Sequence, residues 1–349
     1  MIKILLGVYG DEINAQNING IEIAKRLDKN IFEVHMFYYN KKPNIHNVIF
    51  HKTTSNKIIK NLIKIFVFLK KFDIIYLPRL EKSDILFSKY NKNKSCIISS
   101  IEIENALHDK KYKKFFCDYI FDFFSINEGL RESTLKIWKK NTQVLYLGYY
   151  NLNLSSKTKT SIKRVTFVGS LIKRKNPELF VNIAKKCKNV QFEIIGEGPL
   201  KKELEKKIKQ DKISNVTIIG KVDNKQVYKH LNKSDLLLIT SDNEGQPKVS
   251  LEAASLGVPT CYIKKNYKID YIENNVTGFE AKTEEQIVRL IKKMSKDNDL
   301  YKMISKNVKQ KVKVFNWDNL IRNYEKYFID TLERFEKTRE QYVFKNKID

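Results

Sequence analysis

The stretch Ser234-Asp-Leu-Leu-Leu-Ile-Thr-Ser-Asp-Asn-Glu-Gly-Gln-Pro-Lys-Val-Ser-Leu-Glu252 carries the clearest structural signal in this chain. Its apolar run at 235–240 is bounded by polar residues and predicts a buried strand. A polar loop follows, and Pro247 can start a helix, because proline is well tolerated in a first helical turn. The order strand, loop, helix is typical of parallel α/β sheets, in which ligands bind beyond the carboxyl ends of the strands.

The same alternation of short apolar runs and helical patterns extends over almost the whole chain, which predicts the α/β class with doubly wound parallel sheets. Strands are expected at residues 3–9, 33–39, 48–51, 73–77, 95–101, 119–126, 143–148, 164–168, 191–195, 216–219, 235–240 and 259–263. The most evident helices are expected at residues 16–27, 58–70 and 128–140, with a long amphipathic segment at 315–335.

The length of 349 residues suits about two domains, each large enough for its own core. Residues 151–163 are polar, rich in Ser and Thr, and lose the alternation, so we expect a linker there. The expected N-terminal domain is then 1–150, and the expected C-terminal domain is 164–315. Residues 316–349 form a helical segment that we expect to pack back on the N-terminal domain.

A second loop of the same layout follows the expected strand 164–168. The strand ends at Gly169, and Asn176 with Pro177 provides an N-cap followed by proline at the first helical position. Lys175 therefore lies at the mouth of a helix, where an ammonium group suits a phosphate. A plain surface lysine would leave the same pattern.

Two more features indicate a ligand site. The loop 194–200 contains Gly196 and Gly198, which let a backbone approach a ligand, although a tight turn needs glycine as well. Glu244 can accept hydrogen bonds from a hydroxyl-rich ligand, and Glu252 lies about one and a half turns into the following helix. Two carboxylates and a phosphate-ready lysine together describe a site for a sugar nucleotide, whereas each alone is also explained by an ordinary solvated side chain.

The charge of the chain favours an anionic partner. Lys and Arg number 66 against 40 Asp and Glu, which leaves a formal charge of +26. Nucleic acid, anionic lipid and phosphorylated small molecules all fit, and so does a coding bias toward Lys, Asn and Ile. A nucleic-acid-binding protein is the alternative from charge alone, but the sequence shows no RRM, KH or helix-turn-helix pattern, so no nucleic-acid partner is expected.

Cysteine spacing and hydropathy argue against a zinc-binding, a disulfide-rich or a membrane-spanning protein. The cysteines form no C-x-x-C pair, so neither a zinc site nor a disulfide framework is indicated and a reducing cytoplasm fits. No apolar run reaches the roughly 18 residues that a membrane span needs. The four cysteines are Cys96, Cys117, Cys187 and Cys261.

The second half, about residues 164–318, resembles the donor-binding domain of retaining glycosyltransferases of the GT-B fold, family 4, also called glycosyltransferase group 1. The resemblance rests on several landmarks in the family's order, which are more specific together than any one alone. They are Phe167-Val-Gly with Lys175, Ile195-Gly-Glu-Gly-Pro-Leu200, Gly220-Lys-Val222, Ser234 to Ser241 running into Glu244 to Glu252, and Asn274-Asn-Val-Thr-Gly-Phe279.

The resemblance implies two Rossmann-like domains facing across a cleft. It implies transfer of a sugar, with retention of configuration, from a nucleotide-sugar donor to a glycan or lipid-linked acceptor, in bacterial surface polysaccharide or lipopolysaccharide synthesis. No metal or other cofactor is strictly required, because a lysine and helix dipoles hold the diphosphate. The implied location is the cytoplasm, at the inner face of the cell membrane. A relative that binds sugar nucleotides without catalysis is the other alternative.

Roles for single residues also follow from the resemblance. Glu244 would face the donor sugar, with the amides of Gly245, Gln246 and Pro247 around the sugar and the diphosphate. Glu252 would hold the ribose hydroxyls.

The leaving group and the base complete the implied site. Lys175 would neutralise the departing diphosphate, and Gly198 and Val222 would flank the base. Directly after Gly169, the family usually has an arginine where this chain has Ser170. Arg174 or Lys248 is a possible substitute.

A basic segment in the first half could bring the protein to a membrane. Residues 34–72 contain eight lysines and no Asp or Glu, and 58–69 is strongly apolar. Such a helix could lie on an anionic membrane. The alternative is a helix packed on the N-terminal sheet with its lysines outward.

Overall fold

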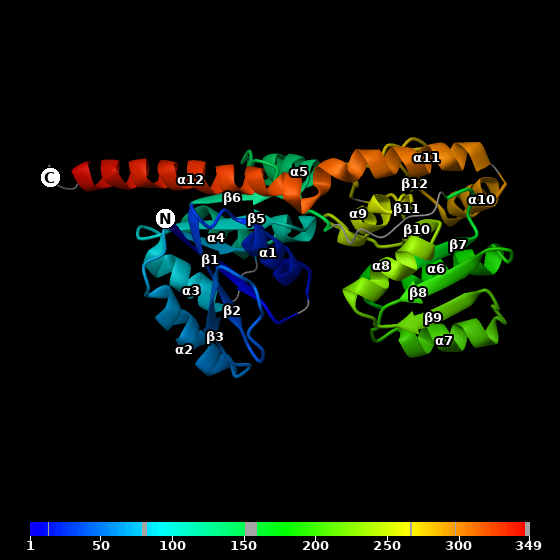
Figure 1. The fold of residues 1–349 in the computed structure, drawn as a ribbon, viewed down its shortest axis with the longest axis horizontal. Helices are drawn as coiled ribbons and strands as arrows, with labels where there is room; N and C mark the ends of the chain where they lie inside the picture. The colour runs from blue at the N-terminus through cyan, green and yellow to red at the C-terminus, as the bar shows by residue number, and fades with distance from the viewer. Residues whose placement is uncertain (13, 79–81, 151–158, 266, 297, 346–349) are drawn as a thin grey trace. The chain divides into compact units, whose positions relative to one another are not determined.

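The computed structural model describes residues 1–12, 14–78, 82–150, 159–265, 267–296 and 298–345. The chain folds into two compact units (Figure 1). Unit 1 comprises Met1–Leu147 with Trp317–Asp349, and unit 2 comprises Gly148–Asn316. Residues 151–158 of the expected linker lie outside the described part of the chain.

Unit 1 is built on a six-stranded sheet in the order β3-β2-β1-β4-β5-β6, with every strand pair parallel. Most residues of its inner strands are buried because both faces of the sheet are covered. The strands are β1 (Ile2–Tyr9), β2 (Phe32–Tyr38), β3 (Val48–Lys52), β4 (Ile74–Leu77), β5 (Cys96–Ile101) and β6 (Asp122–Ser125). The helices are α1 (Ala15–Arg26), α2 (Lys57–Phe68), α3 (Lys82–Asn91), η1 (Glu104–His108), α4 (Lys110–Tyr119), α5 (Glu128–Trp138) and α12 (Trp317–Lys345).

Helix α12 belongs to unit 1 although it comes last in the sequence (red in Figure 1). Trp317, Tyr324 and Phe328 are buried in the same core as the strands of this unit. The side chain of Arg26 on α1 bonds to Asp318 at 2.5 Å. The unit therefore needs both ends of the chain to complete its core.

Unit 2 repeats the architecture with a six-stranded parallel sheet in the order β12-β11-β10-β7-β8-β9. Its strands are β7 (Arg164–Val168), β8 (Gln191–Ile195), β9 (Val216–Gly220), β10 (Leu236–Ile239), β11 (Thr260–Ile263) and β12 (Phe279–Ala281). Its helices are η2 (Lys173–Lys175), α6 (Pro177–Lys186), α7 (Lys201–Gln210), α8 (Asn224–Lys233), α9 (Lys248–Ser255), α10 (Glu284–Met294), α11 (Asn298–Lys311) and η3 (Val312–Phe315). The expected pair of doubly wound α/β sheets is confirmed.

Two expected strands of unit 1 are wrong in part or whole. Residues 143–148 form no strand, only a single bridge between Val144 and Ser125. The carbonyls of Leu145 and Tyr146 accept instead from the hydroxyl of Tyr324 on α12, at 3.4 and 3.1 Å. The strand expected at 119–126 is shorter, because α4 continues to Tyr119.

Strand β12 is present although the sequence indicated only a turn there. The turn is present, with the amide of Asn275 donating to the carbonyl of Gly278 at 2.8 Å. The amide of Glu280 donates to Oδ1 of Asn274 at 3.0 Å. Phe279–Ala281 then pairs in parallel with β11, so a strand of three residues closes this edge of the sheet.

Candidate functional site

Four loops of unit 2 gather at the carboxyl edge of its sheet. They are 241–247 after β10, 169–175 after β7, 196–200 after β8 and 221–223 after β9. Because β10, β7, β8 and β9 are consecutive neighbours in the sheet, their loops are neighbours too. This edge is where open α/β sheets bind ligands.

Backbone hydrogen bonds tie three of these loops together. The amide of Asp242 donates to the carbonyl of Arg174 at 2.8 Å, which joins the loop after β10 to that after β7. The amide of Leu171 donates to the carbonyl of Glu197 at 2.9 Å, and the amide of Leu200 donates to the carbonyl of Leu171 at 3.1 Å. These two bonds join the loop after β7 to the loop after β8. The loops therefore form one connected surface.

The glycines of the loop after β8 are needed for this close packing. Gly196 has φ +146°, and a Cβ there would lie 1.9 Å from the carbonyl oxygen of Gly169. A Cβ on Gly198 would lie 2.5 Å from the carbonyl oxygen of Leu171. These two glycines therefore have a structural role, because only residues without a side chain let the loop after β8 pack against the loop after β7.

The centre of the site is a carboxylate with two cations. Nζ of Lys175 donates to Oε1 of Glu244. Nη1 of Arg174 lies 3.6 Å from Oε2 of Glu244 and donates to the carbonyl of Asn243 at 2.7 Å. Glu244 is buried, while the side chain of Lys175 is 21% exposed. The three charges sum to +1, and the lysine that carries part of this charge reaches solvent.

Local structure fixes Lys175 in this position. Asn176 has the left-handed backbone conformation, with φ 45° and ψ 55°, and caps α6 by accepting from the amide of Leu179 at 3.3 Å. Pro177 begins α6, as the sequence predicts. The hydroxyl of Thr240 donates to the carbonyl of Lys175 at 2.9 Å, which anchors the residue to the end of β10.

The loop after Glu244 leads directly into α9. Gly245 and Gln246 are half-buried, Pro247 is buried, and Pro247 is the N-cap residue. The amide of Ser250 donates to the carbonyl of Pro247 at 2.8 Å. Because proline has no amide hydrogen, Pro247 has no N–H group to donate, whereas Gly245 and Gln246 each have one.

Glu252 lies in α9 and is buried. Burial raises the pKa of Glu252 above its ordinary value, against the lowering effect of Lys248 one turn earlier. The contacts described for Glu252 stay within its own helix, as when the hydroxyl of Ser255 donates to its carbonyl at 2.7 Å. The structure thus joins Lys175 directly to Glu244.

The remaining predicted residues occupy the rim. Ser170 is exposed, and Val222 is half-buried in the loop before α8. Nζ of Lys248 lies over the ring of Tyr150, 5.6 Å from its centroid. Of the two possible substitutes for the missing arginine, Arg174 is the one that contacts Glu244.

Tyr267 is a candidate that sequence reasoning missed. It lies in the segment after β11, is 8% exposed, and its hydroxyl has no hydrogen-bond partner among the described residues. Burial, and next the nearby Glu244 carboxylate, raise the pKa of Tyr267 well above its ordinary value. No motif marks this tyrosine, so only the fold reveals that it lies close to Glu244.

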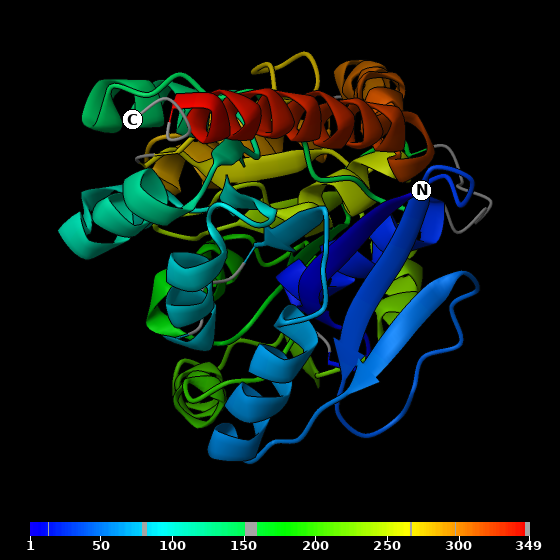
Figure 2. The same ribbon diagram turned by 90° about the vertical axis from the view of Figure 1, so that its left-hand side faces the viewer.

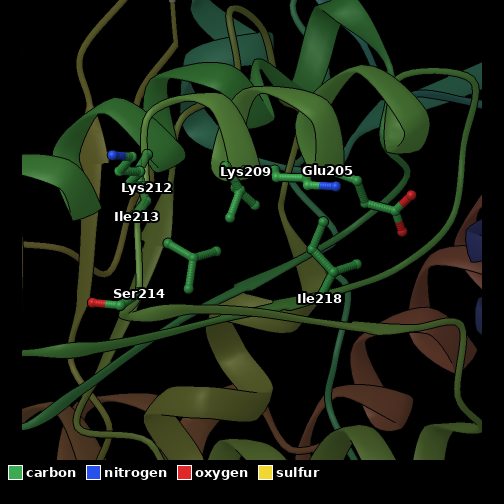
Figure 3. Close-up of a pocket in the computed structure, with 8 residues that line it drawn as sticks. Glu205, Lys209, Lys212, Ile213, Ser214 and Ile218 are labelled. Atoms are coloured by element: carbon green, nitrogen blue, oxygen red, sulfur yellow. The ribbon is translucent and has the colours of Figure 1, made fainter.

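The surface of unit 2 contains hollows, one of which borders the cluster of Lys175, Arg174 and Glu244. A hollow of about 330 Å³ borders the cluster and is lined in part by Lys173, Asn176 and Asp242. A larger one, about 520 Å³, lies between the end of α7 and β9 and contains none of the predicted site residues (Figure 3). Within the described residues, no group of three or more His, Cys, Asp or Glu could hold a metal ion.

Comparison with known proteins shows what the chain is similar to. Residues 155–311 match the family model for glycosyl transferases group 1. HepE of Anabaena, solved with UDP and glucose, superposes with a TM-score of 0.79 at 14% identity, over 95% of this chain and 100% of that one. Residues 155–311 are therefore similar to group 1 glycosyl transferases, and the expected fold, two parallel-sheet α/β domains of the GT-B type, is confirmed. Every predicted site residue lies within the matched region.

Two curated relatives are similar to parts of the chain. One, from Campylobacter jejuni, is the alpha-1,4-N-acetyl-D-galactosaminyltransferase named for GalNAc-alpha-(1->4)-GalNAc-alpha-(1->3)-diNAcBac-PP-undecaprenol. It is 36% identical over 163 residues, 43% of this chain and 44% of the relative. The O-antigen biosynthesis glycosyltransferase WbnH of Escherichia coli is 30% identical over 139 residues, 40% of this chain and 39% of the relative. The chain thus matches less than half the length of both.

Proposed function

We propose that this protein is a retaining glycosyltransferase of family 4 that moves a sugar from a nucleotide-sugar donor to a glycan or lipid-linked acceptor. The observation that carries the proposal is the cluster of Lys175, Arg174 and Glu244 at the carboxyl edge of a matched group 1 domain. Bacterial surface polysaccharide or lipopolysaccharide synthesis is the proposed setting, supported by the names of the two curated relatives. The cytoplasm, at the inner face of the cell membrane, is the proposed location.

The proposed reaction breaks the bond between the anomeric carbon and a phosphate oxygen, and the diphosphate leaves with the electron pair. A bond forms from the same carbon to an acceptor hydroxyl oxygen, whose proton passes to the departing diphosphate. Charge therefore builds on the leaving group, and fixed cations lower the barrier by stabilising it. Lys175 and Arg174 are held for this role by their shared contact with Glu244.

Other residues of the edge would hold the rest of the donor. Glu244 would face the sugar, and the amides of Gly245 and Gln246 would approach the sugar and diphosphate. Glu252 would bind the ribose hydroxyls.

The rim of the site would take the base, with Gly198 and Val222 beside it. Gly169 and Ser170 would lie near the phosphates, where Arg174 supplies the cation that Ser170 lacks. We propose that no bound metal is needed for transfer. Activity that survives an excess of EDTA supports this point, and activity restored only by a divalent cation contradicts it.

Turnover of single-site variants tests the proposal. We expect Lys175→Ala and Glu244→Gln each to reduce kcat by about 10² to 10³, as for the loss of one preorganised group at a developing charge. The matched control is Lys185→Ala, which breaks an exposed Lys–Asp pair of the same unit, 3.1 Å long in the native protein. Steady-state rates with a panel of UDP, GDP and ADP sugars provide the measurement.

Two outcomes of this assay contradict the proposal. Wild-type rates in both site variants would remove the cluster from the mechanism. Tight binding of a sugar nucleotide without transfer to any acceptor, and without donor hydrolysis in the absence of acceptor, would instead indicate a non-catalytic relative.

We further propose peripheral contact with an anionic membrane through the basic segment 34–72. This contact would bring the enzyme to a lipid-linked acceptor. Within the described residues, no helix is both long and apolar enough to span a bilayer.

A further inference from the structure

Helix α2 turns an apolar stripe toward solvent. Ile58, Leu62, Phe66 and Leu69 are spaced by four, four and three residues, which places them on one side of a helix. Their exposed fractions lie between 61% and 73%. Helices of globular domains ordinarily turn such a stripe toward the core, so this helix is oriented the opposite way.

The lysines of α2 explain its orientation. Nζ of Lys64 lies 2.6 Å from Oδ1 of Asp84 on α3, and both side chains are 1% exposed. Nζ of Lys60 lies over the ring of Tyr9 on β1, 5.9 Å from its centroid. The helix therefore packs on the sheet with these lysines inward, and the alternative of a helix with its lysines outward is wrong for both.

Helix α3 extends the apolar surface. The two helices are neighbours (Figure 2), joined by stacked rings of Phe68 and Phe87 whose centroids are 3.8 Å apart. Ile85, Leu86 and Tyr90 of α3 are 41%, 50% and 68% exposed. We name the exposed set the α2–α3 apolar face, comprising Ile58, Ile59, Leu62, Phe66, Leu69, Ile85, Leu86 and Tyr90.

Exposed lysines lie on and next to these two helices. Lys57, Lys70, Lys71 and Lys89 are exposed on α2, α3 and the turn after α2. Helix α2 has no acidic residue, and the one acidic residue of α3, Asp84, is buried against Lys64. An apolar face with exposed lysines around it has the composition of helices that lie in the interface of anionic bilayers.

We propose that the α2–α3 apolar face inserts into the headgroup region of a bilayer that contains anionic lipids, with the surrounding lysines on the phosphates. A second copy of the chain fits less well, because it would bring two lysine-rich faces together in a chain of net charge +26. The inference goes beyond the donor site and beyond the segment 34–72, since it assigns the contact to two helices and to insertion as well as to charge. It can therefore succeed or fail independently of the proposed transfer reaction.

Vesicle flotation with the full chain tests the proposal. We expect the protein to float with vesicles of phosphatidylcholine and phosphatidylglycerol and to bind pure phosphatidylcholine at least tenfold more weakly. The double variant Leu62→Gln/Phe66→Gln should lose at least tenfold in binding to the mixed vesicles. Its matched control is Leu135→Gln/Met303→Gln, which changes side chains that are 44% and 46% exposed elsewhere and should bind like the wild type.

A second readout reports insertion directly. Trp138 and Trp317 are buried, so Phe66→Trp adds a solvent-exposed indole to a chain that otherwise has none. We expect its emission to shift to shorter wavelength on mixed vesicles and to be quenched by brominated lipid. Unchanged emission with the protein bound would contradict insertion.

Three further outcomes of the flotation assay separate the possibilities. Equal flotation of wild type and the Leu62→Gln/Phe66→Gln variant would overturn the proposal. So would a wild-type dimer that becomes monomeric in this variant while vesicle binding stays the same, because the occupant would then be a second copy. Glu244→Gln should float like the wild type, so a loss of sugar transfer in that variant leaves the membrane inference intact.

Discussion

Glu244 contacts two cations, Lys175 and Arg174. Lys175 and Arg174 come from the loop after β7, whereas Glu244 comes from the loop after β10. The shared carboxylate holds the two cations close together, so in the proposed reaction little reorganisation would be needed when negative charge develops. An isolated lysine on a surface loop would have to lose its conformational freedom at that moment.

Glu102, at the carboxyl end of β5, gives a prediction for stability against pH. Burial raises its pKa to about 7, against hydrogen bonds from Ser100 and Gln16. The folded protein therefore holds this proton over a range where the unfolded chain has released it. Stability should fall as pH rises from about 4.5 to 7, and the loss contributed by this group should reach about 3 kcal/mol above pH 7.

Urea unfolding of Glu102→Gln isolates that contribution, because all other titrating groups are shared with the wild type. The variant should gain stability relative to the wild type between pH 5 and pH 8. A difference between the two proteins that stays constant over this range would show that Glu102 is ionised in the folded state at both pH values.

The side of helix α2 that faces the core could not be predicted from its sequence. Its apolar residues surround the helix, since Ile63, Val67 and Phe68 face the core while Leu62 and Phe66 face solvent. Periodicity alone therefore cannot say which side is inward. The orientation of α2 depends on Asp84, which lies on another helix and forms a buried ion pair with Lys64.

The buried Lys64–Asp84 pair predicts a large effect of removing one partner. Lys64→Met should lower the free energy of unfolding by about 3 to 5 kcal/mol, because Asp84 is left buried without a compensating charge. Replacing both, as in Lys64→Met/Asp84→Leu, should restore most of that stability. Urea unfolding measures each variant.

An exposed pair supplies the control for this prediction. Lys114 and Asp118 on α4 lie 3.4 Å apart with side chains 78% and 39% exposed, so Lys114→Met should change stability by less than about 1 kcal/mol. Equal effects of Lys64→Met and Lys114→Met would show that burial of the Lys64–Asp84 pair has no energetic consequence.

Over the whole molecule, the sequence predicted most strands because the inner ones are mostly apolar and buried. It failed where tertiary contacts decide, as at 143–148, whose carbonyls bind the hydroxyl of Tyr324 from the far end of the chain. The three-residue strand β12 carries too little pattern to be recognised without its neighbour β11.

The candidate site divides in the same way. Lys175 and Glu244 stand out in the sequence because a helix cap and a glycine-proline loop mark them. The contact between Arg174 and Glu244 depends on the packing of two loops, which the sequence does not show. Tyr267 could be recognised as a candidate only from the position of β11 in the structure, since its own segment carries no distinguishing residues.

If Lys175 binds the diphosphate of a nucleotide, as we propose, the affinity for that nucleotide should depend on this side chain. Calorimetric titration should find one nucleoside diphosphate among UDP, GDP and ADP that binds the wild type. Lys175→Met should weaken that binding at least tenfold while leaving the affinity for the matching nucleoside unchanged, and Lys185→Met should match the wild type for both ligands. Equal affinity of wild type and Lys175→Met for the diphosphate, or no binding of any nucleoside diphosphate, would contradict the account.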